Sequence, residues 1–204
     1  GSPYNVYRQQ DWYSDKWDDG AFYLDYDPMR NIFEQMKELQ SKTPHMGMIQ
    51  DYSTLINSEY VNHAGSLKIC YLIFNADFNE NVHYSTLVVR VKDSMDCMMV
   101  GESELCYEDI NDGHCFKLFF SEDNQECKDS YFLKACSGCS DCFGCVNLRN
   151  KQYHIFNEPY TKEEYFQKLK EFKLHTYSGF VKAQKQARDF WLTHPLRAAQ
   201  LRCA

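Results

Sequence analysis

Four cysteines at intervals of three residues have the clearest capacity for chemistry in this chain. The stretch KACSGCSDCFGCVNLRN places Cys136, Cys139, Cys142 and Cys145 in one CxxCxxCxxC run. Thiolates bind zinc and iron–sulfur clusters, so a metal site is the first hypothesis. Structural zinc sites, however, usually use two CxxC knuckles separated by a loop. The bacterial iron–sulfur run has a longer last gap and ends on proline, whereas Val146 follows Cys145.

A structural interpretation of the run competes with the metal hypothesis, and we prefer it. Ten cysteines in a chain without a secretion signal favour reduced thiols, metal ligands or small buried residues over disulfides. Some members of the run are then expected to point inward and to stack on Cys115 or Cys127. No resident cofactor is expected in this interpretation. The alternative is a zinc or iron–sulfur redox module that uses the four cysteines, with Cys127 in reserve.

Other chemical signatures are weak. Seven histidines are scattered, without an HxxxH or HExxH spacing, and the sequence has no GxSxG, GxxxxGK[ST] or GxGxxG motif. His114 precedes Cys115, but neighbours on a strand point to opposite faces, so this pair is not expected to act as base and nucleophile. A weaker alternative is a carbohydrate-active solenoid that uses two carboxylates. Its candidate acids recur in the predicted turns: Asp77, Glu80, Glu102, Glu104, Glu122 and Asp123.

The elements that position the cysteines are predicted to be strands. Between residues 57 and 157, short apolar runs such as KICYLIF, STLVVRV and CFKLFF alternate with Asn, Asp, Ser and Gly, and no helical period intervenes. Alternation within a strand predicts that Tyr71 and Ile73, Met98 and Val100, and Phe116 and Leu118 face inward, with Lys117 outside.

The spacing of the cysteines predicts a repeat. Cys97, Cys106 and Cys115 are nine residues apart, as are Cys127, Cys136 and Cys145. Two or three strand-plus-corner units of this length form a coil of about 18 to 27 residues, and such coils stack with equivalent side chains in ladders. The predicted fold is therefore mainly β, a parallel and right-handed β-solenoid (β-helix) with cysteine ladders.

Helices are predicted on both sides of the solenoid. Residues 1–56 are read as an irregular aromatic segment plus a helix packed on the solenoid, with Asp27 as N-cap, Pro28 as first residue and Pro44 as terminator. Its apolar stripe is expected to be buried: Met29, Ile32, Phe33, Met36 and Leu39.

A helical pair in residues 158–204 is expected to cap the solenoid. Thr161 and Glu164 predict a capping box for the first helix, whose buried stripe is Tyr165, Phe166, Leu169 and Phe172. The second helix is predicted from about Gly179 to Thr193, with Phe180, Ala183, Ala187, Phe190 and Trp191 on one side.

Composition limits the partners. Residues 1–150 carry 12 Lys and Arg against 24 Asp and Glu, so an acidic body disfavours nucleic acid. No stretch approaches the roughly 20 apolar residues that a membrane-spanning helix needs, and no signal segment opens the chain. A soluble cytoplasmic protein with no membrane contact is expected. Its partner is then an unknown protein or other macromolecule.

Several stretches resemble one bacterial family. WYSDKWD, FEQMKELQ, DSYFLKACSGCSDCFGCVNLRNKQYHIFN and ARDFWLTHP are similar to an uncharacterised family of cysteine-rich zinc-ribbon and cysteine-repeat proteins from candidate-phyla (patescibacterial) bacteria. The resemblance runs from about Tyr4 to Pro195, and CFGCVNLRNK is its most specific motif. It implies the repeat architecture and brings no established activity.

Departures from the family argue for packing. The family typically carries a zinc CxxC where this sequence has Arg8 and Asp11, so a ribbon zinc site is not expected here. Val82, Asp109 and Asp112 stand where relatives often have cysteine. Because thiols are absent from these positions, the ladder is interpreted as packing. The function predicted from the sequence is a non-catalytic scaffold or macromolecule-binding module, with exposed aromatic residues of the first 26 positions as contact candidates and no cluster of shifted titratable groups in a cleft.

Overall fold

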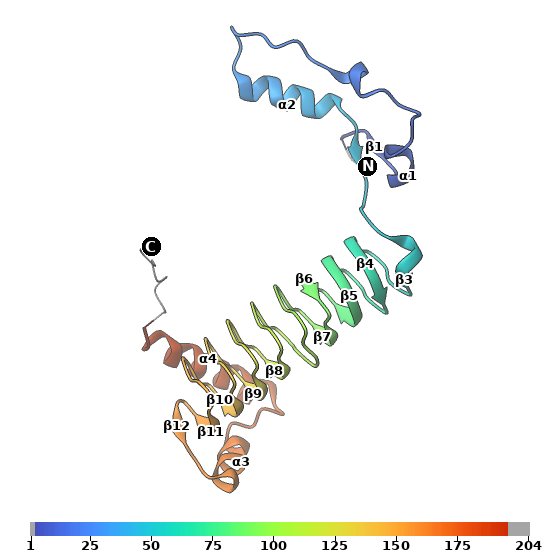
Figure 1. Ribbon diagram of the computed structural model, residues 1–204. Helices are drawn as coiled ribbons and strands as arrows, with labels where there is room; N and C mark the ends of the chain where they lie inside the picture. The colour runs from blue at the N-terminus through green and yellow to red at the C-terminus, as the bar shows by residue number, and fades with distance from the viewer. Residues whose placement is uncertain (1–2, 196–204) are drawn as a thin grey trace, which may run out of the picture. The chain divides into compact units, whose positions relative to one another are not determined.

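In a computed structural model, which describes residues 3–195, the chain divides after Asp51 into two compact units (Figure 1). The first unit pairs strand β1 (Val6–Tyr7) in parallel with β2 (His45–Met46). It also contains helix α1 (Gln9–Trp12), the 3-10 helix η1 (Asp19–Phe22) and helix α2 (Ile32–Lys42). The ring of Trp17 contacts the rings of Tyr7 in β1, Trp12 in α1 and Phe22 in η1, and so links these three elements.

The start of α2 differs from the prediction. The N-cap is Asn31, whose side chain accepts a hydrogen bond from Phe33 N at 2.8 Å. Asp27 instead closes a turn by accepting from Met29 N at 2.9 Å. The buried amide of Gln35 bonds to the backbone N–H and C=O of Asp27, which holds this turn outside the helix. Both Asp27 and Asn31 can cap, so the pattern alone did not separate them. The helix ends before Pro44, as predicted.

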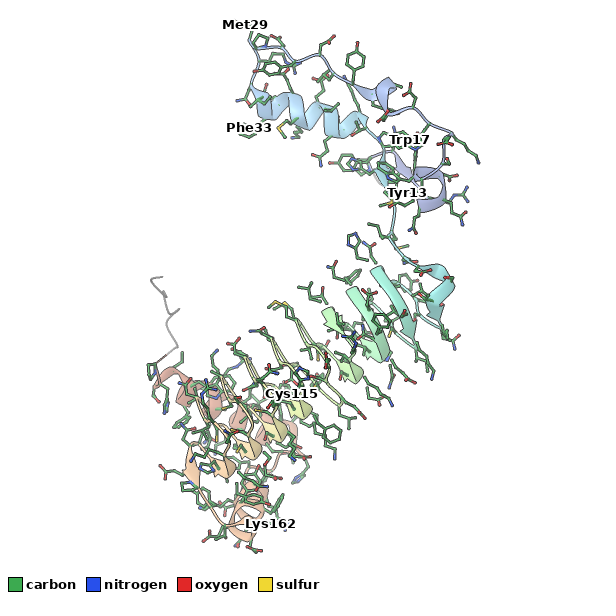
Figure 2. All side chains as sticks on the ribbon, viewed as in Figure 1. Tyr13, Trp17, Met29, Phe33, Cys115 and Lys162 are labelled. Carbon is green, nitrogen blue, oxygen red and sulfur yellow. The ribbon has the colours of Figure 1, made fainter. Side chains whose placement is uncertain are left out.

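The apolar stripe of α2 is exposed, which contradicts the prediction of a buried stripe. Met29 is 91% exposed, Phe33 76% and Met36 59% (Figure 2). Gln35 is the buried residue of this helix, because its amide is occupied by the preceding turn. That residues 1–56 pack on the solenoid stays a prediction.

The second unit is a parallel β-solenoid of about eight turns between residues 55 and 155. Every parallel pairing within the solenoid joins residues twelve apart, for example Ala64 with Ala76, and Phe116 with Lys128. The strands are β3 (Leu55–Ile56), β4 (Asn62–Lys68), β5 (Phe74–His83), β6 (Thr86–Val89), β7 (Lys92–Met95), β8 (Phe116–Phe119), β9 (Lys128–Tyr131), β10 (Ser140–Phe143), β11 (Gln152–Ile155) and β12 (Glu158–Pro159). The 3-10 helix η2 (Tyr52–Thr54) precedes them.

The coil is therefore twelve residues long, and the predicted length of 18 to 27 is wrong. Side chains point inward at every third residue, so residues nine apart both point inward. Nine is not a multiple of the coil length of twelve residues. Cysteines nine apart consequently lie on different sides of the solenoid. Cysteines twelve apart stack on one another, as do Cys115, Cys127 and Cys139. The parallel β-solenoid with inward cysteines is confirmed.

Every third residue points inward because a left-handed residue recurs every three positions. Tyr60, Leu72 and Tyr84 have φ values of 53°, 52° and 51°, and the next residue of each turns into the core. Only the second member of each predicted inward pair is buried: Ile73, Val100 and Leu118. Left-handed backbone is unfavourable for side chains with a Cβ. Here it is supported by hydrogen bonds between coils, such as Tyr84 N to Tyr71 O at 3.0 Å.

Two helices follow the last coil. Helix α3 (Lys162–Glu171) has the predicted Thr161 and Glu164 capping box and packs against β11. Helix α4 (Tyr177–Leu192) starts two residues earlier than predicted, because Thr176 caps it by accepting from Gly179 N at 3.1 Å.

These helices do not share one role. Tyr165 of α3 is buried in the last coils, whereas Phe166 is 41% exposed and leaves the predicted stripe. The buried side of α4 contains Ala183, Ala187 and Trp191, as predicted. The rings of the second core cluster place α4 on a side of the final coils (Figure 1). The edge of β11 is paired by β12, which runs antiparallel to it.

Candidate functional site

The CxxCxxCxxC run lines the inside of one coil, which we call the cysteine coil. Cys136, Cys139, Cys142 and Cys145 occupy four consecutive inward positions, so a coil of twelve residues carries one thiol on each of its sides. All four are at most 2% exposed, and none is in a disulfide. Cys127 lies directly one coil earlier, under Cys139. The structure thus brings all five candidate ligands together. Cys203 lies outside the described residues.

Each thiol of this coil is bonded to the backbone of neighbouring coils. The sulfur accepts the N–H of the residue twelve positions later; for Cys145 this is Asn157 N at 3.5 Å. The thiol donates to a carbonyl of its own strand or of the next coil. Cys142, for example, lies 3.2 Å from Ser140 O and 3.6 Å from Lys151 O. A cysteine in this position is a small apolar side chain that still satisfies a buried N–H group.

Serine and asparagine fill the same position in other coils. Ser130 Oγ accepts Cys142 N at 3.0 Å, and Asn124 Oδ1 accepts Cys136 N at 2.9 Å. We call this the acceptor slot: an inward side chain that receives the backbone N–H twelve residues ahead. The slot explains why Cys, Ser and Asn recur among the inward residues, whereas the other inward positions are mostly filled by aliphatic side chains such as Ile73 and Leu118. Reading the sequence at intervals of three would have revealed it.

Hydrogen bonds among the thiols make one of them more acidic than the rest. The thiols of Cys127, Cys136 and Cys142 can donate to Cys139 in place of their backbone carbonyls, and this donation lowers the pKa of Cys139 below that of an ordinary thiol. Donation to Cys139 raises the pKa of Cys142 in turn. Cys115, labelled in Figure 2, lies one coil before Cys127, and burial raises the pKa of its thiol to about 12. The sulfurs around Cys139 are thus held mainly as thiols.

The cluster is not arranged as a metal site. Among residues 3–195, no group of three or more His, Cys, Asp or Glu side chains is placed to hold a metal ion. A tetrathiolate site needs four deprotonated sulfurs directed at one point. Here the lone pairs and protons of the sulfurs are engaged with the backbone and with each other. The zinc assignment therefore stays a prediction without support from this geometry.

Two carboxyl groups are buried in another coil. Asp109 and Asp112 are 0% and 2% exposed and point inward, as does Val82. Each uses one oxygen in the acceptor slot: Asp109 Oδ1 receives Ser121 N at 3.0 Å, and Asp112 Oδ1 receives Asn124 N at 2.6 Å.

The second oxygen of each of these carboxyl groups is unpartnered. Within residues 3–195, Oδ2 of Asp109 and of Asp112 has no hydrogen-bond partner. Burial raises the pKa of Asp112 to about 7 and the pKa of Asp109 well above its ordinary value. Sequence reasoning did not single out these groups as titratable, because it did not use the three-residue period. They lie in the solenoid core and not in a cleft.

The remaining candidates are separated. His114 is exposed and lies 3.2 Å from Glu102, whereas Cys115 is buried, so the two point to opposite sides as predicted. The acids proposed for carbohydrate chemistry are distributed over three outer faces, and Glu80 and Glu104 share one of them two coils apart. Several of the acids are paired with cations. Glu80 bonds to Lys68 at 2.7 Å, and Glu122 bonds to Lys134.

The aromatic segment at the N-terminus supplies exposed rings. Tyr13 is 70% exposed, Tyr23 74% and Tyr26 65%, whereas Trp17 is packed and donates to Trp12 O at 2.9 Å (Figure 2). The tyrosines remain the contact candidates of the first unit. Among the described residues, no helix is long and apolar enough to cross a membrane.

The comparisons with known proteins give no family: no family model matches the chain, and no curated protein matches it.

Proposed function

We propose that this chain is a non-catalytic β-solenoid scaffold that binds another macromolecule, a protein in the first place, through its outer faces. The observation that carries the proposal is the direction of the reactive side chains. Every described cysteine is buried, and those of the cysteine coil are occupied by backbone groups. The chemistry that a partner can reach is therefore that of the outward residues.

The outer faces suit a large partner. Coils of a β-solenoid repeat about every 4.8 Å, so equivalent side chains form straight ladders along each face. One ladder alternates in charge, with Lys68, Glu80, Lys92 and Glu104 at twelve-residue steps. Because the acidic residues outnumber the basic ones in this part of the chain, a nucleic-acid backbone would be repelled. A protein surface is the partner that regular, mixed ladders favour.

The metal or redox alternative would require a rearrangement of the core. Sulfurs of the cysteine coil would have to leave their backbone partners, and the N–H groups of residues such as Asn157 would lose their acceptors. The contacts that Cys139 makes with three other thiols are the feature that favours this alternative. It is therefore tested first.

The first experiment is elemental analysis of protein purified anaerobically without chelator, together with an ultraviolet–visible spectrum. The Cys139→Ser and Cys142→Ser double variant is the matched control. We expect less than about 0.1 metal ion per chain in both proteins, and thiols that react with a thiol reagent only after denaturation. About one zinc or an iron–sulfur absorbance per chain, lost in the variant, would overturn the scaffold proposal.

The second experiment tests macromolecule binding. A photo-crosslinking residue is placed at one outward position on each face, for example at Tyr84 and at Lys117, in the full chain. Irradiation in cells that naturally make the protein, followed by reconstitution with the purified crosslinked partner, should give an adduct at one face and not at the others. Absence of a reproducible adduct from all four faces would contradict the proposal.

A further inference from the structure

One outward face of the solenoid is aromatic over most of its length, and we call it the aromatic face. It is formed by the outward residue pairs at twelve-residue steps from Glu59-Tyr60 to Ile155-Phe156. In the C-terminal coils it is covered by rings from the helical pair. The centroid of Phe180 in α4 lies 4.4 Å from that of Phe120 and 5.4 Å from that of Phe132. The covered ring of Phe132 is 1% exposed.

The N-terminal coils of the same face carry exposed rings. Tyr60 is 63% exposed and Tyr84 54%. Both rings contact Tyr71, at 5.4 and 5.7 Å between centroids, so the ladder of rings continues from coil to coil. Tyrosine presents a large apolar ring with a polar end, which is the character of residues enriched in protein interfaces. The face thus changes from buried phenylalanine to exposed tyrosine without a change in backbone.

A groove lies where the covered and the exposed parts meet. Its volume is about 760 Å³, and it runs along the flank of α4. Tyr177 and Val181 of α4 line it and are 86% and 43% exposed. The floor is made by Tyr107, Phe120 and Tyr131 of the solenoid. Helix α4 therefore has a second apolar flank, which faces the open part of the aromatic face.

Acidic residues follow this groove on the same face. Asp96 and Glu108 occupy the two coils between Tyr84 and Phe120. Neither forms an ion pair within residues 3–195. Arg188 of α4 lines a small cavity with both acids, and no ion pair joins it to either. A partner that covers this surface is complementary if it brings cationic side chains to these two positions.

We propose that a basic amphipathic helix of a partner protein docks beside α4. Its apolar side would fill the groove and cover Tyr84, and its Lys or Arg residues would lie next to Asp96 and Glu108. The proposal rests on the binding function proposed above and adds the place and the class of partner.

The chain itself contains a helix of this type on the same face. Helix α4 buries Ala183 and Ala187 and packs Phe180 onto the solenoid, while Lys182 and Lys185 stay exposed. Packed helices lie about 8 to 10 Å apart, so a second helix placed beside α4 would rest on the adjoining coils. Recognition of an amphipathic helix by an apolar groove is a common mode of protein binding.

The test uses the full chain and a labelled peptide with the sequence of residues 174–195, which serves as the basic amphipathic helix. Fluorescence anisotropy should show saturable binding at low salt. The same peptide with Lys182→Glu, Lys185→Glu and Arg188→Glu should bind at least tenfold more weakly, because repulsion replaces attraction at the two acids. Absence of saturable binding by the basic peptide would overturn the proposal.

Variants of the full chain locate the site. The double variant Asp96→Lys with Glu108→Lys should bind the basic peptide at least tenfold more weakly. Tyr84→Asn should weaken it severalfold, and asparagine tolerates the left-handed backbone of this position. The matched control, Glu102→Lys with Glu126→Lys on another face, changes the charge equally and should alter the affinity less than twofold. If both double variants lost the same affinity for the peptide, the net charge of the chain alone would explain the effect, and the proposed site would be wrong. A crosslinked partner found on a different face would retain the scaffold function and overturn the helix proposal alone.

Discussion

Two coils with the same backbone have very different interiors. The cysteine coil has Cys136, Cys139, Cys142 and Cys145 at four consecutive inward positions. The second coil, which we call the carboxyl coil, has Cys106, Asp109, Asp112 and Cys115 at its four inward positions. In both coils an inward side chain accepts the backbone N–H twelve residues ahead. The cysteine coil satisfies its polar atoms, whereas the carboxyl coil leaves Oδ2 of each aspartate without a partner.

The difference indicates what the solenoid requires of its core. An inward position accepts either an aliphatic side chain, such as Ile73, Val100 or Leu118, or a small side chain that offers one acceptor to the next coil. Thiol, hydroxyl, amide and carboxyl groups all supply such an acceptor. An amide does so with its second polar atom also satisfied. Asn124 donates Nδ2 to Leu133 O at 3.2 Å, and Asn79 donates Nδ2 to Val88 O at 2.9 Å, in each case nine residues ahead. A protonated carboxyl group can donate in the same way, whereas a carboxylate cannot.

The carboxyl coil should make the protein less stable as the pH rises. In the folded state the pKa of Asp112 is raised from 3.8 to about 7, so the folded protein binds more protons than the unfolded chain between these values. Its stabilising contribution is full below pH 3.8 and is lost as the pH rises through 7. The shift corresponds to about 4 kcal/mol in the free energy of unfolding as an upper bound. Urea unfolding at pH 4, 5.5 and 7.5 measures it.

The Asp109→Asn and Asp112→Asn double variant should remove most of this dependence. At pH 7.5 we expect it to be more stable than the natural chain by up to about 4 kcal/mol, because an amide fills the slot and donates to the next coil. Glu126→Gln, at an exposed position, is the control and should change stability by less than about 0.5 kcal/mol. A double variant that is destabilised at pH 7.5 would show that the carboxylates have a partner in solution.

The cysteine coil should respond to loss of the acceptor more than to loss of sulfur. Cys139→Ala removes the acceptor of Lys151 N and leaves a small cavity, for which we expect a loss of about 2 kcal/mol in the free energy of unfolding. Cys139→Ser keeps an acceptor and should cost about 1 kcal/mol. Thermal and urea unfolding under reducing conditions measure both. If serine is as damaging as alanine, the thiols of this coil have a role that an acceptor slot does not describe.

The sequence supported the type of fold but not its period. Short apolar runs and regularly spaced cysteines predicted a β-solenoid, and the Thr161 and Glu164 capping box predicted the start of α3; both are confirmed. The coil length was wrong because cysteine spacings of nine share the factor three with a coil of twelve. Residues with left-handed backbone are usually glycine or asparagine, which makes such turns recognisable in a sequence. Here many are Tyr, Leu or Ile, such as Ile69, so the recurring turn was not visible.

The candidate site was predictable only in part. Tertiary structure brings the four cysteines of the run into one coil, and their spacing of three was sufficient to suspect a shared environment. The partners of their sulfurs are backbone groups twelve residues away, which no motif records. The carboxyl coil was hidden for the same reason. Asp109 and Asp112 look like turn residues unless the sequence is read in threes, and only burial shifts their pKa values.

The smallest effect is expected from an exchange between the slot residues themselves. Ser130 Oγ accepts Cys142 N at 3.0 Å and donates to Lys128 O at 2.7 Å, which are the bonds that a thiol makes in neighbouring coils. Residues 106, 118, 130 and 142 stack on one another at twelve-residue steps. Ser130→Cys would therefore place a thiol one coil from that of Cys142 and two coils from that of Cys106. Because the slot accepts either atom, the free energy of unfolding should change by less than about 1 kcal/mol.

Ser130→Ala, which lacks an acceptor, should lose about 1 to 2 kcal/mol and provides the contrast. A loss from Ser130→Cys that equals the loss from Ser130→Ala would mean that sulfur and oxygen are not interchangeable, and the cysteine coil would then owe its composition to something other than packing.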